Sequence, residues 1–318
     1  MDMVRLGRTG LNVSAAGLGT GGYSRLGLGQ AKDADHAVGI VHAALDLGIN
    51  IIDTSSFYGT EEVVGTAIKG RREKVVISTK NLMVREGTSL VGDEYLTAAE
   101  FKQAVEGNLS RLGTDYIDML HVHGVCDHQY AYCYEELVPV LHQLRDEGKI
   151  RFLAVSERFY VEPRHEMLLR ALKDDVWDVV MVGFNMINQT AIRDVLPLCV
   201  EKDVGTLCIY AVRSHLATLE GAKKLVGDAI AAGEVDPADL DPDNPLGFVL
   251  QDSGAPSLTN ACYRFNRHTP GAHVILTGTG SVAHLEDNVR SINDGPLPPA
   301  LIEKLSRIFG RVTSVSGD

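Results

Sequence analysis

Residues 48–59 of the chain read GINIIDTSSFYG, and this stretch predicts the architecture. Its β-branched apolar run predicts a strand that ends at Asp53, and the polar residues that follow predict a loop carrying Tyr58. Two later apolar runs end in the same way, at Lys80 and at His123. In a (β/α)₈ barrel, catalytic side chains come from the carboxyl ends of several strands. The pattern therefore predicts such a barrel, with an active site at these strand ends.

Eight candidate strands alternate with helical patterns along the chain. They are centred on Leu18, Ile51, Val76, Leu120, Leu153, Val180, Leu207 and Ile275. This alternation is typical of a parallel sheet covered by helices. Ahead of these strands, residues 4–14 predict a β-hairpin that caps one end of the barrel. We predict a single (β/α)₈ TIM barrel domain over residues 1–318, a length that such barrels commonly use.

An open, doubly wound sheet would show the same alternation, and its dinucleotide-binding form needs a glycine-rich turn that leads directly into a helix. Residues 17–22, GLGTGG, have the composition of such a turn. Residues 23–29 contain two further glycines, which disfavour a helix there. The glycine-rich stretch is therefore weak support for the doubly wound fold.

Helix boundaries are marked at several positions. Residues 97–100 form a capping box, an apolar stripe follows, and Gly113 ends the predicted helix. Asp33 begins another helix, which Gly48 closes. Residues 241–245, DPDNP, are rich in turn-forming residues and predict an inserted loop.

Composition and charge exclude several classes of protein. The formal net charge is -12, which argues against binding to a nucleic acid backbone. No apolar run reaches the roughly 18 residues of a membrane-spanning helix, and the first residues lack the pattern of a signal peptide. The five cysteines include no C-x-x-C pair and predict reduced thiols. We expect a cytoplasmic protein with no nucleic acid or membrane partner.

Four segments together carry a resemblance to a known family. They are residues 17–20, 53–61, 77–80 and 115–123. In these segments the chain resembles the aldo-keto reductases, and the resemblance extends over nearly its whole length. It implies an NAD(P)-dependent oxidoreductase with a catalytic tetrad at Asp53, Tyr58, Lys80 and His123.

The chemistry of these four side chains agrees with that role. Reduction of a carbonyl by hydride leaves an alkoxide, so a nearby group must donate a proton to the oxygen. Tyr58 is the proposed donor, and the ammonium of Lys80 favours the phenolate that remains. Asp53 would pair with Lys80, and His123 would orient the substrate oxygen. The alternative interpretation is an ordinary ion pair between neighbouring strand ends.

His121 lies two residues before His123, where the family usually has an apolar residue. We expect a hydrogen-bonded histidine inside the barrel. A second hypothesis makes His121 and His123 an H-x-H metal pair, as in metal-dependent hydrolases with the same barrel, although no third ligand is apparent. A third hypothesis is a regulatory subunit that binds nucleotide and has negligible turnover.

The resemblance also implies a set of cofactor-binding residues. They are Gly19, Thr20, Gly21, Ser156, Ile209, Arg213, Gly278, Gly280, Ser281, His284 and Asn288. Gly280 and His284 fall where relatives that prefer NADPH carry basic residues, so we expect NAD or mixed use. Glu157 replaces the family's asparagine, which binds the nicotinamide carboxamide. Ile209 replaces a tyrosine that stacks on the nicotinamide ring in many members.

The substrate is expected to be a small carbonyl compound or a sugar. Residues 126–134 predict a loop over the pocket, and their polar side chains suit a hydroxylated substrate. In the reverse direction the same residues would oxidise an alcohol. An aldose dehydrogenase that converts a sugar hemiacetal to a lactone is therefore an alternative function.

Overall fold

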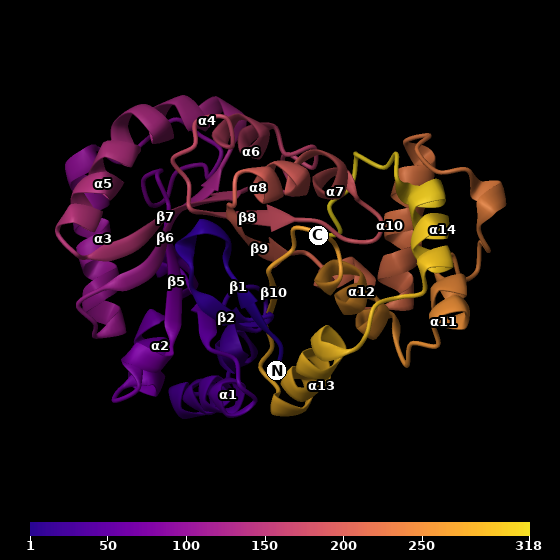
Figure 1. The fold of residues 1–318 in the computed structure, drawn as a ribbon, viewed down its shortest axis with the longest axis horizontal. Helices are drawn as coiled ribbons and strands as arrows, with labels where there is room; N and C mark the ends of the chain where they lie inside the picture. Colours follow the sequence, from indigo (N-terminus) through magenta and orange to yellow (C-terminus); the bar gives the residue numbers. More distant parts are fainter.

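The strands form a closed parallel barrel. The computed structural model describes residues 1–318. The barrel strands are β3 (Ala16–Gly19), β4 (Ile51–Asp53), β5 (Val76–Asn81), β6 (Ile117–Val125), β7 (Ile150–Glu157), β8 (Val179–Gly183), β9 (Gly205–Ile209) and β10 (Val274–Thr277). They pair in the order β10, β3, β4, β5, β6, β7, β8, β9 and close on themselves (Figure 1). The predicted (β/α)₈ fold is confirmed, and each predicted strand centre lies within one of these strands.

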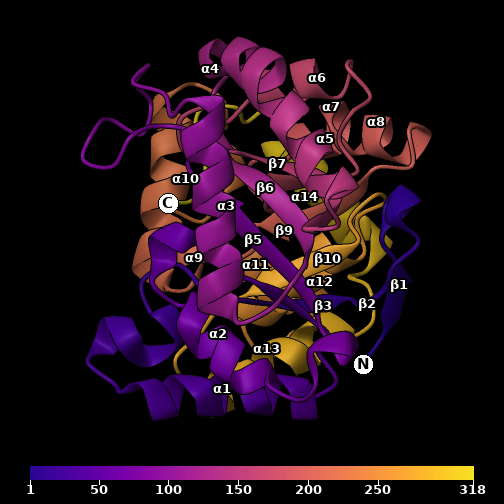
Figure 2. The ribbon, with the colours of Figure 1, turned by 90° about the vertical axis from the view of Figure 1, so that its left-hand side faces the viewer.

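Helices surround the barrel and extend to one side of it. They are α1 (Ala34–Asp46), α2 (Glu61–Ile68), α3 (Ala98–Leu112), α4 (Asp127–Tyr132), α5 (Val138–Asp146), α6 (Glu166–Ala171), α7 (Thr190–Asp194), α8 (Leu196–Glu201), α9 (Arg213–Leu216), α10 (Leu219–Ala231), α11 (Gly247–Ser253), α12 (Leu258–Arg267), α13 (Val282–Asn293) and α14 (Pro299–Phe309). Figure 2 shows α3 in front of β5 and β6. Figure 1 shows α10, α11 and α14 gathered at one side of the molecule. No helix is both long and apolar enough to cross a membrane.

The predicted boundaries of α3 are confirmed. Thr97 accepts a hydrogen bond from the backbone N–H of Glu100, and the Glu100 side chain accepts from the backbone N–H of Thr97. This reciprocal capping satisfies two of the backbone donors that an α-helix leaves free at its start. Gly113 ends the helix with a φ of 61°, a left-handed conformation that favours glycine.

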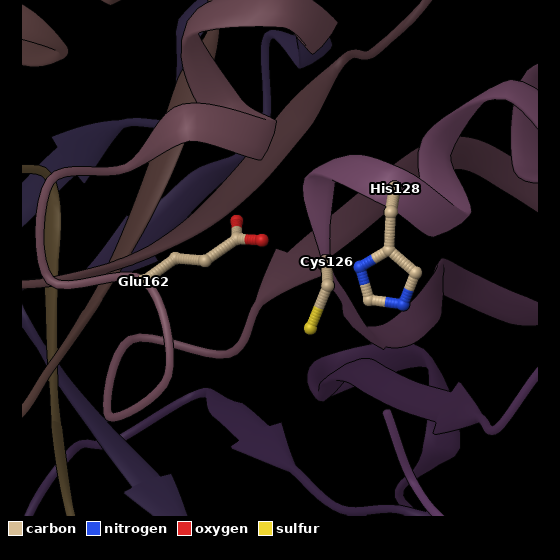
Figure 3. Close-up of side chains that lie close together, drawn as sticks. All are labelled: Cys126, His128 and Glu162. Atoms are coloured by element: carbon tan, nitrogen blue, oxygen red, sulfur yellow. The ribbon is translucent and has the colours of Figure 1, made fainter. Parts of the chain in front are cut away.

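The sequence predicted loops at residues 126–134 and 241–245, and the structure shows a helix in the first and a turn-rich connection at the second. Residues 126–134 were predicted as a loop, but α4 begins at Asp127. Figure 3 shows His128 on this helix. The prediction was wrong because the Gln129 side chain accepts from the backbone N–H of Cys126 and thereby caps the helix. Residues 241–245 do form a turn-rich connection, but it lies between helices α10 and α11.

The N-terminal hairpin closes one end of the barrel, as predicted. Its strands β1 (Met3–Arg5) and β2 (Asn12–Ser14) pair antiparallel. Leu6 and Val13 are fully buried and pack into the barrel interior. There they form a cluster with Ile51, Met119, Ala154, Val179, Met181, Leu207 and Val274. These strand residues precede the polar strand ends, so the hairpin lies at the end of the barrel opposite the candidate site.

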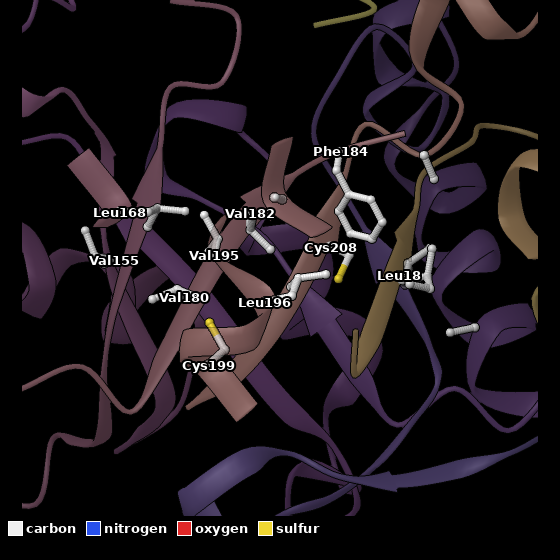
Figure 4. Packing of buried hydrophobic residues seen from close by; sticks show 14 of the residues in the cluster. Leu18, Val155, Leu168, Val180, Val182, Phe184, Val195, Leu196, Cys199 and Cys208 are labelled. Carbon is white, nitrogen blue, oxygen red and sulfur yellow. The ribbon is translucent and has the colours of Figure 1, made fainter. Parts of the chain in front are cut away.

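The larger apolar core lies between the strands and the surrounding helices. Figure 4 shows part of it, where Val180 and Val182 of β8 and Cys208 of β9 lie near Leu196 and Cys199 of α8. All of these side chains are fully buried. Because successive residues of a strand face opposite sides of a sheet, these outward residues alternate with inward ones such as Met181. Apolar side chains therefore pack on both faces of the barrel sheet.

Candidate active site

Asp53 and Lys80 form a buried ion pair at the ends of β4 and β5. Lys80 Nζ donates to Asp53 Oδ2 at 2.6 Å and to the backbone oxygen of Thr54 at 2.9 Å. The Lys80 side chain is 0% exposed, and burial alone would lower its pKa. Attraction to the Asp53 carboxylate outweighs this effect and raises the pKa of Lys80 above its usual value. The ammonium therefore stays charged in a dry environment.

Tyr58 lies beside this ion pair. It ends a short 3₁₀ helix, Ser56–Tyr58, whose first turn is capped by the Ser55 side chain. Lys80 Nζ lies 5.1 Å from the centre of the Tyr58 ring. The ring meets that of His123 edge-on, with 5.7 Å between centroids and 87° between planes. The structure therefore brings the four side chains predicted from the strand ends into one cluster.

The hydrogen bonds around His123 leave one of its nitrogens free to face a substrate. Its Nδ1 lies 3.1 Å from Ser55 Oγ. The Ser55 hydroxyl also donates to the backbone oxygen of Lys80 at 3.2 Å, an acceptor that it shares with Ser56 Oγ. Burial, Lys80 and Arg158 hold the pKa of His123 well below its usual value. The imidazole is therefore neutral, and in the tautomer that has the proton on Nε2 it donates to a substrate oxygen.

His121 lies inside the barrel and makes a hydrogen bond, as expected. Its Nε2 lies 3.0 Å from Ser78 Oγ, which donates to Asp53 Oδ1 at 2.8 Å. Nε2 must therefore be the protonated nitrogen, and Nδ1 is buried without a partner. Burial, with repulsion from Lys80, lowers the pKa of His121 to about 3. These contacts and the nearby cation favour a barrel-interior histidine over a metal ligand.

A cavity of about 690 Å³ leads away from Asp53 and Tyr58, a size typical of cofactor sites. Seven of the predicted cofactor-binding residues line it. They are Gly19, Gly21, Ile209, Arg213, Gly278, His284 and Asn288. A Cβ at Gly21 would lie 2.6 Å from the Tyr58 ring, and one at Gly278 would lie 2.7 Å from the oxygen of Gly19. At these two glycines the cavity is bordered by bare backbone, which suits close approach by a dinucleotide.

Four other predicted residues do not line the cavity. Thr20 is fully buried and shares a hydrogen bond with Thr60. Ser156 Oγ accepts from the backbone N–H of Gly124 at 2.7 Å. The backbone oxygen of Gly280 bonds the ring of His36. Ser281 caps the N-terminus of α13, which is a favourable place for an anion next to the cavity.

Several cavity residues escaped the sequence analysis. They include Tyr23, Gln30, Tyr210, Ser214 and Asp287. Asp287 could have been predicted from the sequence, because it lies three residues after His284 and so shares its face of α13. Tyr210 could not have been predicted in this way, because its position depends on a left-handed backbone with a φ of 69°.

Glu157 does not point into the cavity. Its carboxylate is fully buried and accepts from the backbone N–H of Gly183 at 2.7 Å. Its other oxygen lies 2.7 Å from His165 Nδ1. Ser156 and Glu157 face opposite sides of β7, so this glutamate packs among the elements behind the strand. It is therefore not a substitute for a carboxamide-binding asparagine.

A separate group of possible metal ligands lies near α4. One ligand atom from each of Cys126, His128 and Glu162 lies within 4.8 Å of the others (Figure 3). The two Glu162 oxygens already accept from the backbone N–H groups of Asp127 and Met167. Burial also raises the pKa of the Cys126 thiol to about 11, although the Arg158 guanidinium opposes this. This group does not include His121 or His123.

The sequence matches a known protein family. A sequence profile of the Aldo/keto reductase family matches residues 16–308. The chain belongs to the aldo/keto reductase family. Members of this family act on small-molecule carbonyl substrates, so membership supports an oxidoreductase.

Two curated relatives of this aldo/keto reductase have named activities. L-galactose dehydrogenase of Arabidopsis thaliana is 26% identical over 302 residues, which cover 92% of this chain and 89% of the relative. NADH-specific methylglyoxal reductase of Escherichia coli is 31% identical over 215 residues, which cover 63% of this chain and 64% of the relative.

Solved structures show the same fold. An aldo-keto reductase of Bacillus halodurans in its holo form has a TM-score of 0.72 at 22% identity, with 98% of each chain covered. An aldo-keto reductase of Klebsiella pneumoniae in complex with NADPH has a TM-score of 0.67 at 24% identity, with 100% of this chain and 98% of the other covered. At these identities the likeness of this aldo/keto reductase to them extends to the fold alone.

Proposed function

We propose that this protein is an NAD(P)-dependent oxidoreductase that interconverts a carbonyl and an alcohol, with Tyr58 as the general acid and base. The observation that carries the proposal is the buried Asp53–Lys80 ion pair beside Tyr58, at the end of a cavity bordered by backbone. An ion pair with a purely structural role would not need a partly exposed tyrosine against it. The family match adds independent support.

The chain's residues would act on the carbonyl oxygen. A dinucleotide bound in the cavity supplies the hydride. Tyr58 donates its proton as negative charge develops on the oxygen, and Lys80 stabilises the phenolate that remains. Asp53 holds Lys80 through the 2.6 Å contact, while His123 Nε2 donates to the same oxygen and fixes its position.

Replacement of Tyr58 tests the assignment. Tyr58→Phe removes the proton donor and keeps the ring, so we expect turnover to fall by about 100-fold or more, the usual scale for a general acid. Folding and nucleotide affinity should be unchanged, as measured by circular dichroism and nucleotide fluorescence. Tyr134→Phe, at a tyrosine that does not line the cavity, is the control. Turnover at the wild-type level in Tyr58→Phe would refute the assignment.

We further propose that the protein prefers NAD or uses both dinucleotides. His284 and the carboxylate of Asp287 line the cavity beside the N-terminus of α13. A 2′-phosphate placed there would meet a negative charge, although Asp287 also pairs with Arg290 at 2.9 Å. Titration with NADH and with NADPH should therefore give a dissociation constant for NADH no weaker than that for NADPH. Clear preference for NADPH would contradict this expectation.

Oxidation of a sugar hemiacetal to a lactone is a second candidate function. The similarity to L-galactose dehydrogenase favours it. In that direction the phenolate of Tyr58, stabilised by Lys80, accepts the proton of the hydroxyl group. Steady-state rates with NAD and an aldose, compared with rates for NADH and an aldehyde, distinguish the two directions.

A further inference from the structure

Arg158 lies next to the candidate active site at the carboxyl end of β7. Its guanidinium packs on Gly124, the residue after His123, where a Cβ would lie 2.7 Å from Nη2. Nε donates to the backbone oxygen of Gly124 at 3.1 Å, and Nη1 donates to the Tyr160 hydroxyl at 3.0 Å. Only 8% of the residue is exposed. The guanidinium is therefore fixed in place on the strand that carries His123.

This buried cation has no counter-ion. No carboxylate oxygen lies within 4.0 Å of it, since none of the ion pairs in the molecule includes Arg158. The nearby Glu157 pairs with His165, and Glu162 accepts from two backbone N–H groups. Nη2 makes no hydrogen bond to an oxygen. The neighbours of the guanidinium are the Gly124 carbonyl, the Tyr160 hydroxyl and the Cys126 thiol. A largely buried charge that has only such neutral partners is costly, which favours a site kept for an anionic ligand.

The position of Arg158 relates it to the substrate. Its guanidinium carbon lies 3.0 Å from the Cβ position of Gly124, and hence roughly 8 Å or less from the Cα of His123. The adjacent Phe159 contacts Tyr210 edge-on at 5.2 Å, and Tyr210 lines the cavity. The charge of Arg158 also contributes to the low pKa of His123. The cation therefore lies close to the backbone of His123, although Arg158 is not among the residues that line the cavity.

We propose that Arg158 binds an anionic group on the substrate, so that the substrate is an aldehyde or keto acid with a carboxylate a few bonds from its carbonyl. This inference rests on the proposed function and specifies the substrate class of the same site. A guanidinium presents paired N–H donors that match the two oxygens of a carboxylate. A phosphate offers similar oxygens, so the experiment must separate the two anions.

The test compares matched substrates on the wild-type protein with its nucleotide. Succinic semialdehyde and butanal differ by a carboxylate, and glyceraldehyde 3-phosphate and glyceraldehyde differ by a phosphate. We expect kcat/KM for succinic semialdehyde to exceed that for butanal by about 10- to 100-fold, the usual range for a hydrogen bond to a charged group. A larger ratio for the phosphate pair would assign a phosphate to the site. Equal rates within both pairs would overturn the proposal.

Substitutions show whether Arg158 causes the preference. Arg158→Gln should abolish the ratio, because kcat/KM should fall much more for succinic semialdehyde than for butanal, while nucleotide affinity stays unchanged. Arg158→Lys keeps the charge and should retain part of the ratio. Arg164→Gln, at an exposed arginine nearby, is the control and should retain all of it. Equal losses for both substrates, or a loss of nucleotide affinity instead, would show that Arg158 supports the fold or the cofactor.

A binding measurement separates this proposal from the proposed function. Calorimetric titration of the protein–NADH complex with succinate should show binding by the wild type and by Arg164→Gln, and none by Arg158→Gln. If nucleotide binds and succinate and inorganic phosphate do not, the anion site is refuted and the oxidoreductase assignment is unaffected. If no nucleotide binds, the proposed function itself fails.

Discussion

At the scale of single residues, the site is organised by a chain of hydrogen bonds that starts behind it. His121 donates through Nε2 to Ser78, Ser78 donates to Asp53, and Lys80 donates to the other oxygen of Asp53. Each proton in this chain has one consistent position, because Asp53 accepts from both sides. The chain fixes the Asp53 carboxylate and thus the ammonium near Tyr58.

His121 should make the protein sensitive to acid. Its pKa is about 3 when folded, against an ordinary value of 6.5. Below pH 6.5 His121 binds a proton in the unfolded chain but stays neutral in the folded chain. The free energy of unfolding therefore falls as the pH falls from 6.5 towards 3. Between pH 7 and pH 5 this histidine should remove about 2 kcal/mol from the free energy of unfolding.

Urea unfolding at pH 7 and pH 5 measures this contribution. His121→Leu should lose about 2 kcal/mol less than the wild type between the two values. His128→Leu, at an exposed histidine, should lose as much as the wild type. Equal losses in all three proteins would mean that His121 is protonated in the folded state.

At the scale of elements, the loop after β3 leaves room for the Tyr58 ring because it has a glycine, without a Cβ, at position 21. Gly21 lies in this loop, and a Cβ there would meet the Tyr58 ring at 2.6 Å. Real Cβ atoms essentially never come this close, so the ring must move. The close approach explains why the sequence has glycine here, although the local backbone does not have a positive φ.

Gly21→Ala should therefore displace Tyr58 without unfolding the protein. Misplacement of a catalytic group by about 1 Å can cost about 100-fold in rate, so we expect kcat to fall at least about tenfold. Gly39→Ala in α1 is the control, because a Cβ there meets nothing within 4 Å. Steady-state kinetics and thermal unfolding of both variants make the comparison. Unchanged kcat in Gly21→Ala would show that the ring accommodates the methyl group.

At the scale of the whole molecule, the two ends of the barrel have separate tasks. The hairpin end is apolar, with Leu6 and Val13 buried in the interior cluster. The opposite end has the ion pair, the cavity and Arg158. This division is typical of the fold, in which one face carries stability and the other carries chemistry.

Leu6→Ala should lower the stability of the protein without changing its kcat. The side chain is 0% exposed, so its truncation should lower the free energy of unfolding by about 2–5 kcal/mol. At 25 °C the folded fraction should retain wild-type kcat and nucleotide affinity. Met3→Ala, on the same hairpin and 44% exposed, should change stability by less than about 0.5 kcal/mol. A fall in kcat in Leu6→Ala would show that the two ends are coupled.

The sequence by itself determined the barrel and the four residues of the candidate tetrad. Strand identity is a local property, set by β-branched apolar runs, and Asp53, Lys80 and His123 each stand at the end of such a run. Because parallel strands end on the same rim of a barrel, the position of each residue in its own strand was enough to predict that the three would meet.

Only the tertiary structure decided the partners of these residues. Glu157 stands in the sequence where the family has an asparagine, but its side chain pairs with His165 behind the strand. Tyr210 and Arg158 gain their positions from a left-handed backbone and from contact with a neighbouring strand. Hydrogen bonds and burial depend on residues far apart in the chain, and no local pattern encodes them. The missing counter-ion of Arg158, and with it the substrate proposal, became visible only once the chain was folded.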